Sequence, residues 1–278
     1  MQTTLPQQIV PRLALWQKHG STLTLIVLAL PMLCFVFLPL LALLLRASST
    51  MLLKNLGNSA VGQAVGLSLL TTFITTLLAL LFGTPLAYLL ARRRFCGHTL
   101  VDTLLDLPMV LPPAVAGIAL LMAFGRRGLL GPYLTYAGLE IAFSQAAVVM
   151  AQLFVAAPFY VKSATMGFAQ VNREIEQAAA LDGATPWRIF RLITLPLAGP
   201  ALFGGAVMTW ARALGEFGAT IIFAGNFPGR TQTMPLAIYI GFELELNVAL
   251  TLAVILLGFS FGVLGVVKGV LRREFVEL

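Results

Sequence analysis

Residues 65–91 read VGLSLLTTFITTLLALLFGTPLAYLLA and contain no charged side chain. A helix of that length exceeds the roughly 20 apolar residues needed to cross the ~30 Å hydrocarbon core of a bilayer. Backbone amides in lipid must be hydrogen-bonded within their own segment, so a stretch of this kind is expected to be a helix. Comparable stretches recur along the chain and predict an all-α integral membrane protein with six transmembrane helices, at about 22–45, 65–91, 107–125, 142–162, 198–224 and 247–271.

The composition agrees with a membrane protein and argues against a soluble domain. Of the 278 residues, 59% are hydrophobic and only 10% are charged, and the mean hydropathy is +0.92. These values lie well outside the range of soluble domains. The longest stretch outside the predicted helices is the loop at about 162–197, so we predict a single transmembrane domain over residues 1–278.

The basic residues are distributed unevenly between the two sides of the predicted protein. Lysine and arginine are translocated poorly, so the side that is richer in them is expected to face the cytoplasm. This bias predicts that both termini are cytoplasmic, and it explains the net charge of +7 without a nucleic-acid partner. The predicted cytoplasmic side holds Arg12, Lys18, Arg92, Arg93, Arg94, Lys162, Arg173, Arg188, Arg191, Lys268, Arg272 and Arg273, and the opposite side holds Arg46, Lys54, Arg126, Arg127 and Arg230.

The loop between the fourth and fifth predicted helices begins with the pattern of a short capped helix. Asn172 suits the N-cap position, and Glu174 and Glu176 would lie in the first turn, where the helix dipole favours acidic groups. Gly183 is expected to end this helix because glycine enters the left-handed region without a steric penalty. The helix would present a narrow face of small apolar side chains, formed by Ile175, Ala178 and Ala179.

A second helix is expected directly after the glycine. Thr185 and Pro186 suit its N-cap and first position, and Pro196 is expected to end it at the membrane. The stretch 171–196 therefore reads as a compact knob between two apolar segments. An amphipathic hairpin resting on lipid headgroups is an alternative, but lipid insertion favours bulkier apolar residues than alanine. We favour a docking element for a partner outside the bilayer.

The spacing within this knob is similar to the EAA loop of ABC-importer permeases. The matching pattern is Gln177-Ala178-Ala179-x-x-x-Gly183, followed after nine residues by Ile193-x-Leu195-Pro196. Gln177 departs from the family, which usually has Glu at that position. In such permeases the loop forms coupling helices that dock in a cleft of the ATPase subunit. The resemblance implies a coupling role for Glu176, Gln177, Ala178, Ala179, Asp182, Gly183, Ile193, Leu195 and Pro196.

Three further motifs resemble the molybdate branch of these permeases, which is close to the sulfate and thiosulfate permeases. They are LPMVLPPAVAG at 107–117, GRRG at 125–128 and RALGEFGAT at 212–220, and the likeness extends from about residue 60 onward. The resemblance implies the type I ABC-importer permease fold and a multi-pass location in the bacterial inner membrane. It also implies a homodimer, two ATPase subunits that bind ATP and Mg, and an extracytoplasmic oxyanion-binding protein.

Arg212 and Glu216 are the ionisable residues placed well inside a predicted helix. Each costs ~2.5–3.5 kcal/mol at a bilayer centre on insertion scales, so both are expected to face protein or water. Their i, i+4 spacing allows them to pair. Two interpretations stay open: a self-satisfied clamp between helices, or a charged wall or switch on the transport pathway.

Hydroxyl groups line one side of the second predicted helix, at Ser68, Thr72, Thr75 and Thr76. Such hydroxyl groups can line a water-filled path that binds anions weakly. Alternatively, they hydrogen-bond to neighbouring helices or to carbonyls of their own helix, and we favour this second interpretation.

Prolines interrupt the third predicted helix and glycines allow close approach in the fifth. Carbonyl groups freed at a broken helix are tolerated only beside protein or a cavity, so these two segments are expected to form the translocation interface. The candidate pathway residues are Ser68, Thr72, Thr76, Pro112, Pro113, Arg212, Glu216 and Thr220.

The chain lacks the G-x-x-x-x-G-K-[ST] loop that cradles nucleotide phosphates, so the chain is not expected to be an enzyme and its energy must come from a separate ATPase. His19 and His98 stand apart without a carboxylate or cysteine cluster, so neither a metal site nor a cofactor of the chain's own is predicted.

The favoured function is the membrane-spanning permease of an ATP-driven molybdate importer that works by alternating access. Sulfate, thiosulfate or tungstate is the alternative cargo. A membrane-embedded enzyme or an ion-coupled transporter would need paired carboxylates, histidines or a proton relay at mid-membrane, and only Arg212 and Glu216 are available there. A scaffold without transport would leave that pair without a purpose.

Overall fold

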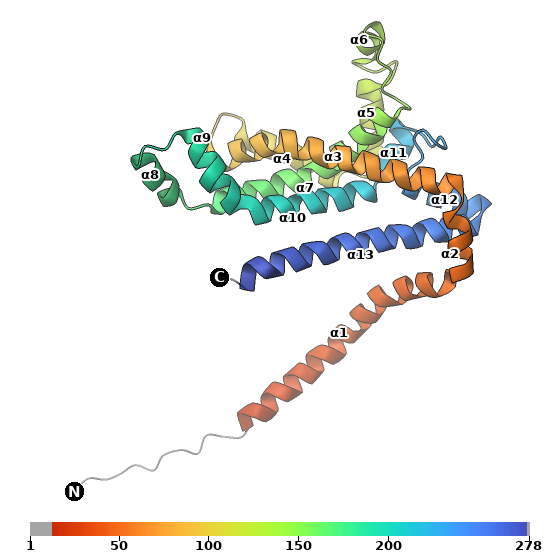
Figure 1. Cartoon of the computed structure of the whole chain (residues 1–278), viewed down its shortest axis with the longest axis horizontal. Coiled ribbons are helices and arrows are strands. Elements are labelled where there is room, and N and C mark those ends of the chain that lie inside the picture. The colour runs from red at the N-terminus through yellow and green to blue at the C-terminus, as the bar shows by residue number, and fades with distance from the viewer. Residues whose placement is uncertain (1–12, 277–278) are drawn as a thin grey trace. The chain divides into compact units, whose positions relative to one another are not determined.

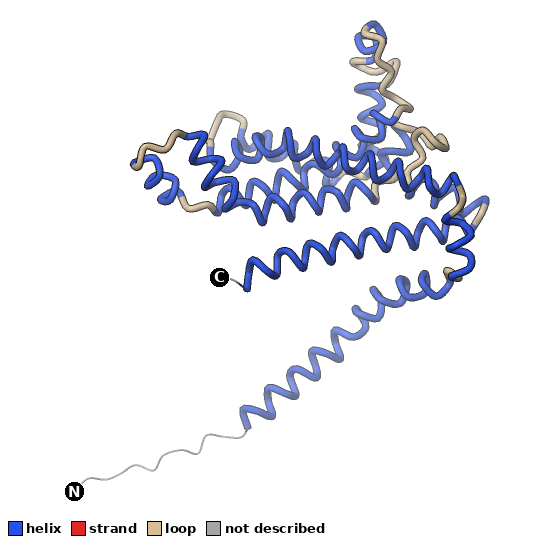
Figure 2. Tube along the Cα trace, in the orientation of Figure 1, coloured by secondary structure: helices blue, strands red, loops and turns tan. Residues whose placement is uncertain are grey.

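The computed structural model describes residues 13–276, and all regular elements within them are helical (Figures 1 and 2). The chain divides into two compact units, residues 1–48 and residues 49–278. The first unit holds α1 (Leu13–Arg46), whose apolar part spans Thr24–Arg46. Of the basic and histidine residues considered above, Arg12 lies outside the described residues, as do the side chains of Lys18, His19, Lys268, Arg272 and Arg273.

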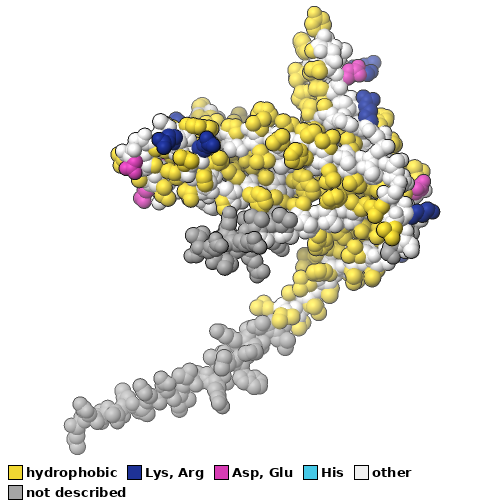
Figure 3. Space-filling model, in the orientation of Figure 1, with side chains coloured by type: hydrophobic (Ala, Val, Ile, Leu, Met, Phe, Trp, Pro, Cys, Tyr) yellow, Lys and Arg dark blue, Asp and Glu magenta, His cyan; other side chains and the backbone are white. Residues whose placement is uncertain are grey.

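Three long helices form the centre of the second unit: α3 (Ser59–Arg92), α7 (Gln145–Gln170) and α10 (Leu195–Leu214). Small residues let these helices approach closely, as is usual for helix packing in membranes. A Cβ atom on Gly83 would lie 2.8 Å from the ring of Tyr160, and one on Gly205 would lie 2.8 Å from Cβ of Ser163. Apolar side chains dominate the exposed surface of the bundle, and charged groups gather toward its ends (Figure 3).

Five helices within the described residues are long and apolar enough to cross a membrane, and a bent helix pair makes a sixth span if it is counted as one. This matches the six segments predicted from the sequence, with ends that differ by several residues. The largest extension at one end is that of the fifth segment, which begins at Pro186 and not at 198, and the fourth segment continues past 162 to Gln170. The five helices are Thr24–Arg46, Ser59–Arg92, Gln145–Gln170, Pro186–Leu214 and Leu246–Gly265.

The third predicted segment, 107–125, is two helices rather than one. Helices α4 (His98–Val110) and α5 (Pro113–Phe124) meet at an angle of 118°. The residue before a proline is pushed out of the helical region, and Leu111 and Pro112 are extended accordingly. A short helix α6 (Gly131–Tyr136) follows α5.

The prediction that Pro196 ends the second helix of the knob is wrong. Helix α9 (Pro186–Ile189) continues through a π-helix at Phe190–Thr194 into α10, which gives one span over Pro186–Leu214. Within the π-turn the Leu195 N–H donates to the Phe190 carbonyl, five residues back. A widened turn of this kind is one of the recognised ways in which a helix absorbs a local disruption such as a proline.

The fifth predicted segment, 198–224, is correspondingly shifted toward the N-terminus. Helix α10 ends at Leu214, and a separate helix α11 (Gly218–Phe223) follows after a break at Gly215–Phe217. Four other helices complete the second unit: α2 (Ser49–Leu56), α8 (Arg173–Leu181), α12 (Met234–Leu244) and α13 (Leu246–Val276). The side-chain amide of Asn55 ties α2 to α13 by donating to the Asn247 carbonyl and to Thr251 Oγ1.

Candidate functional site

The first part of the knob, from Asn172 to Pro186, has the local structure that its residues predict. Asn172 Oδ1 accepts a hydrogen bond from the Glu174 N–H at 2.9 Å and caps α8 (Arg173–Leu181). Gly183 ends the element in the left-handed region, with φ at +82°. Thr185 Oγ1 then accepts from the Arg188 N–H at 3.4 Å, and Pro186 takes the first turn of α9. The sequence-based description of these caps is confirmed.

The outer side of α8 is exposed and partly apolar. Ile175 is 47% exposed and Leu181 is 89% exposed, and both belong to a helix without a buried residue. Five of the predicted coupling residues are exposed, namely Gln177, Ala178, Asp182, Gly183 and Pro196, and Ala179 is half-buried. These exposed apolar side chains leave α8 open to contact with a protein partner.

The inner side of α8 is held by an ionic contact that connects three elements. Glu176 Oε1 lies 3.0 Å from Arg92 Nη2 at the end of α3, and it accepts a hydrogen bond of 2.5 Å from Thr194 Oγ1 in the π-turn. Arg92 Nη2 also donates to the Val171 carbonyl at 3.2 Å. Both charged side chains are largely buried, with 8% exposure for Arg92 and 18% for Glu176. We call Arg92, Glu176 and Thr194 the clasp.

Sequence reasoning found only one member of the clasp. Glu176 was assigned to the coupling loop, but Arg92 was counted as one of a run of cytoplasmic arginines and Thr194 was not considered. The sequence gives little indication that the other two residues contact Glu176, because Arg92 lies 84 positions before it and Thr194 lies 18 positions after it. The remaining coupling residues lie nearer the bundle: Ile193 and Leu195 are half-buried, and Leu195 packs against the core formed by α3, α7 and α10.

At the other end of α10, Arg212 and Glu216 form the predicted ion pair, but the prediction that both lie inside one helix is wrong for Glu216, which lies in the break between α10 and α11. Arg212 Nη1 lies 2.8 Å from Glu216 Oε2, and the glutamate is only 1% exposed. Glu216 Oε1 also accepts a hydrogen bond of 2.9 Å from the Ala219 N–H in the first turn of α11. This carboxylate therefore bridges the break between the two helices, which is the geometry of a clamp.

The structure brings the proline break of the third segment against the break of the fifth. A Cβ atom on Gly218 would lie 2.7 Å from Cβ of Pro113, and one on Gly117 would lie 2.8 Å from the Ala219 carbonyl oxygen. Helices α5 and α11 therefore cross in close contact, as their small residues suggest. Thr220 is fully buried in α11, and its hydroxyl has no partner among the described residues. Pro112 is exposed at the start of α5.

The hydroxyl groups of α3 make hydrogen bonds inside the protein. Thr72 and Thr76 donate to carbonyls of their own helix, at Ser68 and Thr72, with distances of 2.7 and 2.8 Å. Ser68 Oγ accepts from the Met234 N–H at 2.7 Å and so joins α3 to α12. Thr75 bonds to Gln152 Oε1 in α7 at 3.1 Å. A place for Ser68, Thr72 and Thr76 on the pathway stays a prediction, as it does for Pro112, Pro113, Arg212, Glu216 and Thr220.

A second ionic cluster was missed because Lys162 was expected in the cytoplasmic loop. It lies instead within α7, where its Nζ contacts Asp102 Oδ1 at 2.6 Å and Asp106 Oδ1 at 2.9 Å. The two aspartates lie one turn apart on α4, which has no buried residue of its own. The cluster therefore fastens α4 to the central bundle.

Comparisons with known proteins agree with this architecture. Residues 83–271 match the family described as the binding-protein-dependent transport system inner membrane component. The chain belongs to this family. It is therefore a multi-pass transport component of the inner membrane, with the all-helical fold of an ABC-importer permease.

Relatives with similar sequences are named as permeases for different oxyanions. The chain is 42% identical over 222 residues to the molybdenum transport system permease protein ModB of Mycobacterium tuberculosis, covering 80% of this chain and 84% of that protein. It is 36% identical over 245 residues to the molybdate/tungstate transport system permease protein WtpB of Thermococcus kodakarensis, with coverage of 87% and 93%. It is 35% identical over 223 residues to the sulfate transport system permease protein CysW of Synechococcus elongatus, with coverage of 80% and 78%.

Among solved structures, a bacterial ABC transporter involved in the import of the acidic polysaccharide alginate contains a chain with the same fold. The TM-score is 0.72, the match covers 94% of this chain and 99% of that one, and the sequence identity is 16%. At that identity the match bears on the fold alone, and the cargo of the alginate transporter carries no information about this chain.

Proposed function

We propose that this chain is the membrane-spanning permease subunit of an ATP-driven importer of molybdate. The observation that carries the proposal is the knob itself, in which a capped helix with an exposed apolar side is fastened to two membrane-spanning helices by the clasp. Force applied to α8 would pass directly into α3 and into the span that begins at Pro186. The 42% identity to a molybdenum permease supports molybdate as the cargo.

The energy for transport comes from a partner in this proposal. The chain has no phosphate-binding loop, so ATP and Mg are held by two separate ATPase subunits that receive α8 on their surface. The knob and both termini then face the cytoplasm, as the distribution of basic residues predicts. A second copy of this chain completes the membrane channel, and an extracytoplasmic oxyanion-binding protein delivers the cargo.

Transport follows from two conformations with different affinities for ATP. Closure of the ATPases around ATP moves the knob, and rigid-body rocking of the helices opens the cavity toward the binding protein. Hydrolysis then returns the helices to the state that is open to the cytoplasm.

Reconstitution tests both the mechanism and the cargo. The chain, its ATPase and its binding protein are placed in proteoliposomes, and uptake of labelled molybdate is measured with and without ATP. Uptake that requires ATP and survives excess sulfate supports the proposal, and competition by tungstate measures how well the two metals' oxyanions are separated.

Two outcomes point elsewhere. If excess sulfate abolishes the uptake of molybdate, the cargo is sulfate or thiosulfate. The similarity to the sulfate permease CysW would then support that cargo. Uptake that collapses with the proton gradient while ATP is held constant points to an ion-coupled transporter. Failure to take up any oxyanion with ATP contradicts the proposal.

A further inference from the structure

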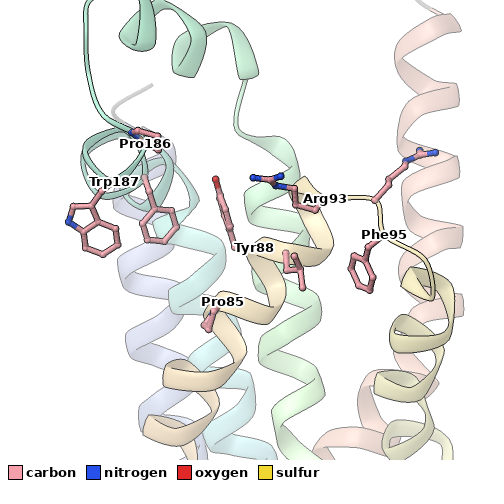
Figure 4. A pocket seen from close by; sticks show the side chains of 9 residues that line it. Pro85, Tyr88, Arg93, Phe95, Pro186 and Trp187 are labelled. Carbon is pink, nitrogen blue, oxygen red and sulfur yellow. The ribbon is translucent and has the colours of Figure 1, made fainter.

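An open groove of about 800 Å³ lies beside the knob, at the end of α3. Its volume falls within the ~300–1,000 Å³ range of typical ligand sites. One wall comes from the last turns of α3 with Pro85, Tyr88 and Leu89, and the facing wall comes from α9 and the π-turn (Figure 4). We call it the aromatic groove, and its lining is completed by Arg93, Arg94, Phe95, Pro186, Trp187 and Phe190.

The groove is built by packed aromatic rings and stays open. Tyr88 and Phe190 meet edge to face with ring centroids 5.1 Å apart, and Trp187 stacks on Phe190 at 5.8 Å. Trp187 is nevertheless 66% exposed and Leu89 is 41% exposed. An apolar surface held in place by ring contacts on one side and uncovered on the other is suited to an apolar ligand.

Two arginines give the groove a positive rim. Arg93 and Arg94 are exposed, and neither side chain makes an ion pair or a hydrogen bond among the described residues. Arg92 differs from both, because its charge is matched by Glu176 in the clasp. Guanidinium groups bind phosphate through several donors at once, so the unmatched pair favours an anionic ligand that carries a phosphate group.

The place of the groove in the fold decides which ligand satisfies both features. Helix α3, a candidate membrane span of 34 residues, ends at Arg92, and the facing candidate span begins at Pro186. The groove therefore lies at the charged ends of two candidate membrane spans, and tryptophan and arginine gather where such spans leave the hydrocarbon of a bilayer. A free anion would meet the arginines and leave the aromatic lining uncovered.

We propose that the aromatic groove binds an anionic phospholipid, with an acyl chain against Tyr88, Trp187 and Phe190 and with the phosphate on Arg93 and Arg94. Because Trp187 and Phe190 belong to the element that continues the knob, the bound lipid braces the coupling element from the membrane side. This role in coupling rests on the proposed function, whereas the binding site itself does not.

Binding is measured on the full chain in a neutral detergent by native mass spectrometry. Phosphatidylglycerol and phosphatidylcholine with identical acyl chains are titrated separately. Phosphatidylglycerol is expected to bind more tightly, and the variant R93Q/R94Q is expected to lose this preference by roughly fivefold per arginine, the equivalent of about 1 kcal/mol each. The matched control R126Q/R127Q removes the same charge from the loop after α5 and should keep the preference.

Two further arms identify the source of the phosphate and the role of the groove. Millimolar inorganic phosphate should leave the bound lipid in place, and Trp187→Ser should weaken both lipids because it shortens the apolar wall. The proposal is overturned if R93Q/R94Q behaves like the control, or if inorganic phosphate displaces the lipid. It is also overturned if assembly with the ATPase expels the lipid, since the groove would then belong to the protein interface. None of these readouts depends on transport, so they stand apart from the uptake assay.

Discussion

Two arginine–glutamate pairs lie at opposite ends of α10, and they connect the protein in different ways. The pair at the knob joins residues 84 positions apart and links α8 to α3. The pair at the far end joins Arg212 to Glu216, four positions later, and bridges a break within one stretch of chain. The first pair is suited to passing motion between elements, whereas the second holds a local geometry. Loss of the first should therefore impair coupling, and loss of the second should impair folding.

The largest effect on stability is expected from Glu216→Ala. The carboxylate is 1% exposed and meets both Arg212 and the Ala219 N–H, so its loss leaves a charge and a backbone donor without a partner. Breaking a buried pair in this way costs about 3 kcal/mol or more. Thermal unfolding in detergent measures the loss.

Glu140→Ala is the control for that change, because Glu140 pairs with Arg126 at the surface with 56% exposure. Exposed pairs contribute about 0–1 kcal/mol, so this variant should unfold close to the wild-type temperature. Equal melting temperatures for Glu216→Ala and Glu140→Ala would contradict the assignment of a clamp.

A smaller effect on stability but a large effect on transport is expected from Glu176→Gln. The change removes the ion pair with Arg92 and keeps a side chain of similar shape. Hydrogen bonds to charged groups contribute about 1.5–3 kcal/mol, so the variant should weaken the link between α8 and α3 by up to that amount. Uptake per ATP hydrolysed is expected to fall, because motion of α8 then passes less fully into α3. Glu174→Gln removes the same charge from the exposed side of the same turn and should preserve coupling. Similar losses in both variants would show that the clasp has no special role.

The smallest effect is expected from Thr194→Val. This change removes the hydroxyl donor to Glu176 but leaves Arg92 in contact, so stability should fall by about 1.5 kcal/mol, the low end for a hydrogen bond to a charged group. Thr165→Val is the matched control, because the Thr165 hydroxyl donates only to the Val161 carbonyl of its own helix. A neutral Thr194→Val, measured beside a neutral control, would mean that the clasp consists of the ion pair alone.

Prediction from sequence succeeded where a feature depends on neighbouring residues. The caps at Asn172 and Thr185 and the turn at Gly183 are decided within four positions along the chain. The six apolar segments were recognisable because the hydrocarbon core sets a minimum length. The pair of Arg212 and Glu216 forms as predicted, but Glu216 lies in the break after α10 and not inside a helix, so helical spacing predicted the right contact for the wrong local structure.

Prediction failed where packing decides among local alternatives. Pro196 lacks a backbone N–H and was therefore expected to end the helix. The helix instead continues past Pro196, and a π-turn at Phe190–Thr194 precedes the proline. Lys162 resembles a loop residue in the sequence, yet two aspartates on α4 hold it within α7. Arg92 could not be separated from Arg93 and Arg94 without the fold, which alone brings Glu176 to it.

The most direct test of the central claim is the coupling of hydrolysis to uptake in Gly183→Pro. Proline fixes φ near −65°, whereas Gly183 has φ at +82°, so the turn of the knob cannot form while the membrane-spanning helices are untouched. Gly138→Pro is the matched control, since Gly138 also has a positive φ of +73° and lies in the loop after α6. We predict that Gly183→Pro loses ATPase association and molybdate uptake, while Gly138→Pro retains ATPase association. Intact coupled uptake in well-expressed Gly183→Pro would contradict the account.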